Sequence, residues 1–141
     1  MKVKDVMTSE VVTCKTSHTL PDCASTMREL NVGVMPVLDD QFNLIGILTD
    51  RDIAVRAVAR GVDPNKAQVG NFMTPHPITV APDINVEDAA EIMADNQVRR
   101  LPVCDSSGKL VGIVSLGDLA VDVGESELIA ETLEEISVPT R

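Results

Sequence analysis

An internal repeat covers most of the 141 residues of this sequence and limits the folds that the chain can adopt. When the chain is shifted by 66 residues, residues 6–57 align with residues 72–123 without a gap. The identities are spread evenly along both copies and include Met7-Thr8 with Met73-Thr74, Pro36-Val37 with Pro102-Val103, and Asp52 with Asp118. An ungapped repeat of this length indicates two copies of one structural unit.

Each copy predicts the element order β-α-β-β-α. In the first copy, an extended segment at 11–14 precedes a helix whose apolar residues follow the spacing i, i+3, i+4, i+7 from Leu20. Two strands in hairpin order follow at 35–38 and 44–48, and a second helix begins at Asp50. The second copy predicts the same elements at 78–80, from Val86, at 101–104, at 110–114 and from Leu116. Thr19 and Asn85 are predicted to cap the first helix of each copy.

These patterns predict a mixed α/β (α+β) fold with two pseudo-symmetric units packed sheet to sheet in one globule. One unit alone cannot bury two helices and a three-stranded sheet. The expected divisions are unit one at 1–58, a linker at 59–71, unit two at 72–123 and an acidic tail at 124–141. The tail is predicted to form an amphipathic helix at 126–136, and we favour packing on its own globule over contact with a partner.

The composition excludes several classes of function. The formal net charge of −10 disfavours a nucleic-acid or anionic-membrane surface, because both need a basic footprint. A phosphate-bearing ligand would need a local cluster of positive charge. With two Phe and no Trp or Tyr, the core must be aliphatic, and a nucleobase site would need aliphatic walls in place of Trp or Tyr stacking.

Cysteine, histidine and the apolar pattern give further expectations. Three unevenly spaced cysteines do not make a disulfide framework, and they predict small buried side chains in a reducing compartment. His18 and His76 stand alone, so no metal site is expected, and a zinc site assembled through space is the less favoured alternative. Neither a signal core nor an apolar run of ~20 residues is present, and we expect a soluble cytoplasmic protein.

Similar turns lead into the second helix of each copy. Thr49 is followed three residues later by Asp52, and Ser115 is followed in the same way by Asp118. Backbone N–H groups at a helix start and the hydroxyl can hold a phosphate, while the carboxylate can accept from two ribose hydroxyls. The simpler explanation is that both pairs only cap a helix.

The arginines distinguish the two copies. Arg51 and Arg56 lie in or just after the first turn, and Arg99-Arg100 precede the Pro-Val strand of the second copy. The corresponding positions of the other copy hold Gly117, Asp122 and Gly33-Val34. If the first turn faces Arg99-Arg100, one cleft is strongly cationic and suits phosphate, whereas adjacent arginines on a solvated surface are the simpler explanation.

From Lys4 to about Val123, the chain resembles the CBS-domain family. The similarity rests on the Met-Thr openings, the two hydrophobic-Pro-Val strands, and the two Gly-h-h-Thr/Ser-x-x-Asp turns, where h is hydrophobic. It is especially similar to short bacterial stand-alone CBS pairs that contain Leu-Thr-Asp-Arg-Asp-Ile and Val-Arg-Arg-Leu-Pro.

The resemblance implies that AMP, ADP, ATP or S-adenosylmethionine binds in clefts shared by the two units, and it implies a homodimer. Site one is implied to use Asp52 for ribose, Thr49 for phosphate, Ile78 and Val98 around the base, and Arg99 and Arg100 at the phosphates. The charge pattern adds Arg51 and Arg56 to the same site. Site two, the weaker one, is implied to use Asp118 and Ser115 with Val12, Val32 and Gly33.

The favoured hypothesis is a nucleotide-sensing regulatory module whose effect is read by a separate, unknown protein. The main alternative is a structural or interaction module with degenerate sites. An enzyme is not expected, and we predict neither catalytic residues nor a catalytic cofactor, because no Ser/His/Asp or Cys/His spacing, credible carboxylate pair or P-loop occurs in the sequence.

Overall fold

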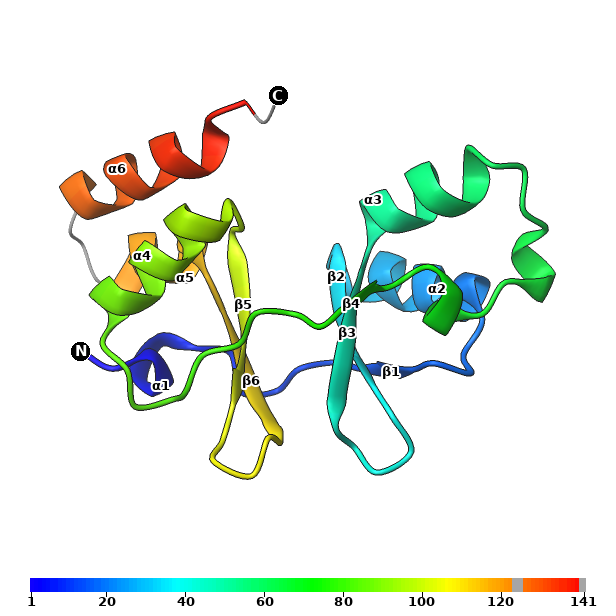
Figure 1. Ribbon diagram of the computed structural model, residues 1–141, viewed down its shortest axis with the longest axis horizontal. Helices are drawn as coiled ribbons and strands as arrows, with labels where there is room; N and C mark the ends of the chain where they lie inside the picture. The colour runs from blue at the N-terminus through cyan, green and yellow to red at the C-terminus, as the bar shows by residue number, and fades with distance from the viewer. Residues whose placement is uncertain (123–125, 140–141) are drawn as a thin grey trace. The chain divides into compact units, whose positions relative to one another are not determined.

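A computed structural model describes residues 1–122 and 126–139 and has the mixed α/β architecture that the repeat predicts (Figure 1). The chain divides into two compact units. The central unit is Val11–Pro77, and the terminal unit combines Met1–Glu10 with Ile78–Arg141. None of the helices in the described ranges has the length and apolar character needed to cross a membrane.

The central unit contains a four-stranded sheet in the order β1-β2-β3-β4. Strand β1 pairs with β2 in parallel, and the other neighbours are antiparallel. The strands are β1 (Cys14–Lys15), β2 (Val34–Leu38), β3 (Leu44–Thr49) and β4 (Thr74–Pro75). The helical elements are α2 (Leu20–Leu30), α3 (Asp50–Asp52), the π-helical η1 (Ile53–Val58), and the 3-10 turns η2 (Pro64–Lys66) and η3 (Val69–Asn71).

The terminal unit repeats this plan around the antiparallel pair β5–β6. Isolated bridges from Val80 to Val103 and from Thr8 to Ile113 occupy the places of β1 and β4. The elements are α1 (Val3–Val6), α4 (Val86–Asn96), β5 (Arg100–Cys104), β6 (Leu110–Ser115), α5 (Leu116–Asp122) and α6 (Ser126–Ser137).

The two copies exchange their Met-Thr segments. Thr74 of the second copy pairs with Ile47, and Thr8 of the first copy forms two backbone hydrogen bonds of 2.9 Å with Ile113. The compact units therefore do not follow the divisions expected from the sequence at 1–58 and 72–123. Each unit is completed by the opening segment of the other copy, because this segment adds the last backbone pairing to its sheet.

Residues 59–71, expected from the sequence to be a linker, contribute to the core of the central unit. Ala67 and Val69 from this range are buried in the central core, and Leu20 N donates to Ala67 O at 3.1 Å. This stretch is therefore part of the central unit. The expected tail boundary at residue 124 falls in residues 123–125, which lie outside the described residues, as do residues 140–141.

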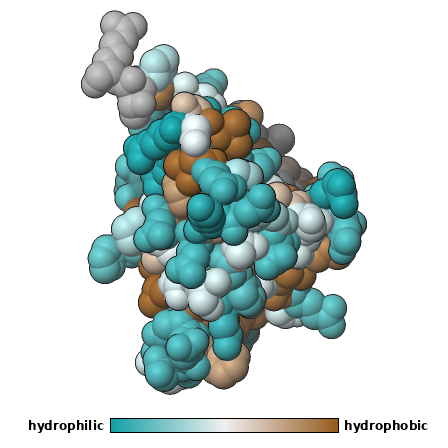
Figure 2. All heavy atoms as spheres, turned by 90° about the vertical axis from the view of Figure 1, so that its right-hand side faces the viewer, coloured by the Kyte–Doolittle hydropathy of each residue, from teal (hydrophilic) through white to brown (hydrophobic). Residues whose placement is uncertain are grey.

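Each unit has its own aliphatic core. Leu20, Met35 and Leu48 are buried in the central unit, and Met93, Leu101 and Leu119 are buried in the terminal unit. Phe42 is exposed and Phe72 only half-buried, so neither core rests on aromatic rings. All three cysteines are free thiols; Cys14 and Cys23 are buried and Cys104 is half-buried. On the face shown in Figure 2, hydrophobic atoms appear in separate places among hydrophilic ones.

One of the two predicted helix caps is present. At the start of α2, Asp22 N donates to Thr19 Oγ1 at 3.4 Å, as expected. Asn85 precedes α4, but its side chain accepts no capping hydrogen bond, so that prediction is wrong. Val86 N instead donates to Met1 O at 3.1 Å, because the chain's first residues lie against the start of this helix.

The expected tail helix is α6, which lies along α4 and α5 (Figure 1). Ile136 is buried in the terminal core, and Leu128 and Ile129 pack against it. Gln97 Nε2 donates to Val138 O at 2.8 Å and to Glu135 O at 3.3 Å. The tail therefore packs on its own unit, as favoured from the sequence.

Candidate functional site

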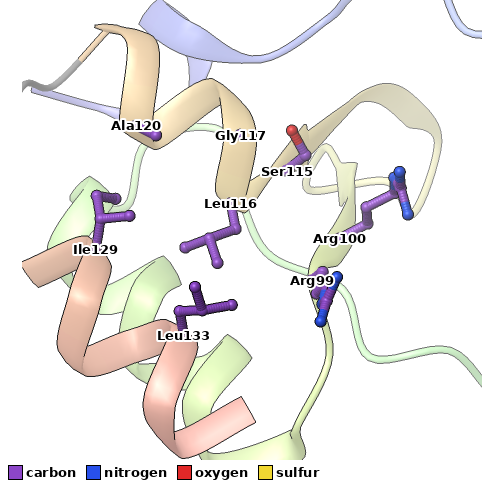
Figure 3. Close-up of a pocket in the computed structure, with 8 residues that line it drawn as sticks. All are labelled: Arg99, Arg100, Ser115, Leu116, Gly117, Ala120, Ile129 and Leu133. Carbon is purple, nitrogen blue, oxygen red and sulfur yellow. The ribbon is translucent and has the colours of Figure 1, made fainter. Parts of the chain in front are cut away.

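A pocket of about 320 Å³ lies in the terminal unit, where β5, β6, α5 and α6 meet. Figure 3 shows its lining. One side is polar and carries Arg99, Arg100 and Ser115. The other side is apolar and is formed by Leu116, Ala120, Ile129 and Leu133. This division suits a ligand with an anionic end and an apolar part.

Strand pairing places the polar groups next to each other. Arg100 stands opposite Ser115 in the β5–β6 pair, and Leu116 N donates to Arg99 O at 2.8 Å. The arginines therefore lie beside the turn of their own copy. The family resemblance implied Arg99 and Arg100 for one site and Ser115 for another, and the structure shows that all three also line one pocket of the terminal unit.

The pocket is cationic at its polar side. Arg99 and Arg100 are exposed, and neither guanidinium has an ion-pair or hydrogen-bond partner among the side chains that the structure describes, which are those of residues 1–121 and 127–139. The turn beside them holds Leu116 and Gly117, where the first copy holds Asp50 and Arg51. Two unpaired guanidinium groups can form charge-assisted hydrogen bonds to a phosphate or carboxylate.

Both hydroxyl–Asp pairs form capping boxes. Ser115 N donates to Asp118 Oδ2 at 2.9 Å, and Asp118 N donates to Ser115 Oγ at 3.0 Å. The corresponding distances for Thr49 and Asp52 are 2.9 and 3.1 Å. The simpler explanation of these pairs is therefore correct for their local role. One carboxylate oxygen of Asp118 and the Ser115 hydroxyl proton take no part in the box.

In the central unit, the Arg56 side chain has partners within its own unit. Its Nε lies 3.6 Å from Asp52 Oδ1, and its Nη1 donates to Met73 O at 3.3 Å and to Phe72 O at 3.5 Å. The guanidinium thus ties the segment before β4 to η1. Beside this turn, the Asp50 carboxylate lies next to Gly33, where an added Cβ would be 2.9 Å from Asp50 Oδ2.

The predicted site residues fall in both units. The central unit holds Val12, Val32, Gly33, Thr49, Arg51, Asp52 and Arg56. The terminal unit holds Ile78, Val98, Arg99, Arg100, Ser115 and Asp118. Each predicted site thus draws on both units, and the joining of the two sets stays a prediction.

Sequence reasoning missed the apolar side of the pocket. Ile129 and Leu133 lie outside the repeat, and their signal was the amphipathic spacing of the tail. In the part of the chain that the structure describes, no cluster of three or more His, Cys, Asp or Glu side chains is arranged to hold a metal ion.

Comparisons with known proteins agree on one family. The CBS domain model matches residues 3–58 and 69–125. The CBS domain-containing protein YhcV of Bacillus subtilis (strain 168) is 44% identical over 135 residues, which cover 96% of this chain and 94% of YhcV.

Two similar structures contain ligands. The CBS domain pair of protein MJ0100, in complex with 5′-methylthioadenosine and S-adenosyl-L-methionine, has a TM-score of 0.78 and 28% identity, covering 89% of this chain and 98% of that one. CBSX2 in complex with AMP has a TM-score of 0.76 and 31% identity, again covering 89% and 98%. The chain therefore belongs to the CBS domain family and contains two CBS domains, at residues 3–58 and 69–125.

Proposed function

We propose that this protein is a regulatory module that binds an adenine nucleotide, with the phosphate held by Arg99 and Arg100. The observation that carries the proposal is the pair of unpartnered guanidinium groups beside Ser115, at one side of a pocket whose other side is apolar. The adenosine compounds bound to MJ0100 and CBSX2 support the ligand class.

The charge of the pocket favours a phosphate-bearing ligand. AMP, ADP, ATP and S-adenosylmethionine are the candidates, and the first three place negative charge next to the arginines. S-adenosylmethionine offers the arginines one carboxylate, but its sulfonium and ammonium groups give it a net positive charge, which two guanidinium groups repel. We therefore rank the adenine nucleotides above it. The readout acts on a separate protein, and the module functions as a homodimer.

Calorimetric titration of ligand-stripped protein with the four candidates tests this function. The expected result is one strong site per chain for an adenine nucleotide. Arg100→Ala removes a charge-assisted hydrogen bond and is expected to cost roughly 1.5–3 kcal/mol, or about 10- to 150-fold in Kd. Arg28→Ala removes an exposed arginine of α2 and serves as the matched control. Equal affinity in the Arg100 and Arg28 variants would contradict the assignment.

The ribose has two candidate acceptors, Asp52 and Asp118. In each capping box the aspartate accepts through Oδ2. Among the described residues, Arg56 lies within 4 Å of Asp52 Oδ1, and no arginine lies within 4 Å of Asp118 Oδ1. Asp52→Ala and Asp118→Ala are titrated after their melting temperatures have been compared with the parent. Selective loss of nucleotide binding in one variant identifies the ribose-binding carboxylate.

The alternative is a structural or interaction module without a ligand. One observation favours it, namely that both hydroxyl–Asp pairs already act as helix caps. Protein that melts cooperatively and gives no heat with any of the four compounds would support this alternative. A partner protein would then be the next object of search.

A further inference from the structure

The apolar side of the arginine pocket includes residues from outside the repeat. Ile129 and Leu133 belong to α6, and the chain has only one such segment after its two copies. The two copies already differ in their arginines, since Gly33-Val34 stand where the second copy has Arg99-Arg100. The tail adds a second difference, an apolar wall that the repeat does not contain.

Contacts on both sides of Leu133 hold this part of α6 in place. Thr132 is buried, and its Oγ1 donates within α6 to Leu128 O at 2.7 Å, while Leu128 and Ile129 pack against the terminal core. Ile136 is buried in the terminal core one turn after Thr132. At the end of the helix, the side-chain amide of Gln97 donates hydrogen bonds to the backbone carbonyls of Glu135 and Val138. A wall that is fixed before binding loses little freedom when a ligand arrives.

Leu133 has free apolar surface directed at the pocket. Its side chain is 42% exposed, although its neighbour Thr132 is buried. Figure 3 shows Leu133 and Leu116 pointing into the same space, with Arg99 next to it and the Arg100 side chain extending away from the leucines at the polar side of the pocket. An apolar ligand group in this space would cover leucine surface, while its anionic group remained within reach of the arginines.

We propose that α6 forms a specificity subsite in which Leu133 and Ile129 contact the nucleoside part of a ligand whose phosphate is bound by Arg99 and Arg100. The inference rests on the proposed function and extends it. It makes α6 the element that distinguishes a nucleoside monophosphate from a simple sugar phosphate. Both compounds offer the arginines the same anion, and only the nucleotide has a base to cover the leucine.

The test compares AMP with ribose 5-phosphate on the full chain, the latter measured by displacement of AMP where it is weak. Leu133→Ala is expected to weaken AMP about 5- to 30-fold, because the base loses apolar contact area. The affinity for ribose 5-phosphate is expected to stay within about twofold of the parent. Leu30→Ala truncates a comparably exposed leucine of α2 and is expected to change neither affinity.

Leu133→Met keeps the apolar volume and is expected to restore AMP affinity. An unchanged AMP affinity in Leu133→Ala, or an equal loss for both compounds, overturns the subsite while leaving nucleotide binding intact. AMP that fails to bind the parent protein overturns the proposed function and the subsite with it. Because the leucine is partly exposed, its truncation is compatible with folding, which the melting temperature checks.

Discussion

Asp105 shows how one exposed side chain can organise a turn. Its Oδ1 accepts from Ser107 N at 2.9 Å, from Ser107 Oγ at 2.7 Å and from Lys109 N at 3.0 Å. The Ser107 hydroxyl, followed by the Lys109 N–H, holds the pKa of this carboxyl below its ordinary value of 3.8. The ionised form therefore stabilises the turn between β5 and β6.

The lowered pKa predicts a pH-dependent effect of Asp105→Asn. The ionised Asp105 carboxylate accepts hydrogen bonds in the folded state that it lacks in the unfolded chain. Its contribution to the free energy of unfolding is therefore fully present above pH 3.8 and is lost as the pH falls through the folded-state pKa. Urea unfolding should show a less stable variant at pH 7 and a smaller difference from the parent in acid. Asp40→Asn, at an exposed carboxylate of the equivalent turn, is the charge-matched control. A difference that does not change with pH would contradict the prediction.

Arg56 and Arg100 mark the limit of sequence reasoning at the residue scale. Sequence reasoning placed both in one cationic cleft, Arg56 just after the first turn and Arg100 before the Pro-Val strand of the second copy. In the structure, Arg56 donates to backbone carbonyls 16 and 17 residues away, a contact that no local pattern contains. Asn85 makes the same point, since its expected capping role is replaced by a hydrogen bond from Val86 N to Met1 O.

At the scale of elements, glycine lets each Met-Thr segment lie close to its strand. A Cβ at Gly46 would overlap Met73 Sδ, and a Cβ at Gly112 would lie 2.6 Å from Met7 Sδ and 2.8 Å from Thr8 O. Contacts this short require the backbone or the methionine to move. The crossing of each segment over the other copy's strand thus depends on a position without a side chain.

Gly112→Ala is therefore expected to destabilise the fold by about 1–3 kcal/mol, since the Thr8 carbonyl cannot move without losing its pairing. Gly117→Ala provides the contrast, because its Cβ meets only Ser115 Oγ at 3.5 Å. That change is expected to be neutral or to stabilise by up to ~1 kcal/mol. Denaturant unfolding of both variants gives the comparison. A Gly112 variant as stable as the Gly117 variant would show that the segment has room to shift.

Elements were the most predictable level, because helices and strands follow from local periodicity. The strand pairs at 34–38 with 44–49 and at 100–104 with 110–115 lie within a residue of expectation. The predicted extended segments at 11–14 and 78–80 are longer than the strands in the structure, since β1 covers only Cys14–Lys15 and Val80 forms a single bridge. The pocket could not be predicted in full, because the packing of α6 on α4 depends on residues far apart in the sequence.

At the scale of the whole molecule, the terminal unit contains residues from both ends of the chain. Val3 and Val6 are buried in its core, and Val3 N donates to Ile84 O at 2.9 Å. The first ten residues are therefore a structural part of a unit whose other residues begin at Ile78. The central unit has its own core and does not include them.

Deletion of residues 1–10 is expected to destabilise the terminal unit selectively. The loss of Val3 and Val6 alone removes about 1.5–3 kcal/mol each of apolar burial. Hydrogen exchange is expected to show lost protection in β6 and α4 and retained protection in β2 and β3. A synthetic peptide of residues 1–10, added in excess, should restore the lost protection. Equal loss in both units, or none in either, would contradict this division.

The exchanged segments also set an order of events during synthesis. Val11–Pro77 holds the contacts of its own unit and can fold once it has left the ribosome. Thr8 must wait for Ile113, which follows it by 105 residues. At about 5–20 residues per second, the nascent N-terminus stays without its partner for roughly 5–20 s. During this interval Val3 and Val6 are exposed to chaperones, and translation speed becomes a variable in the assembly of the terminal unit.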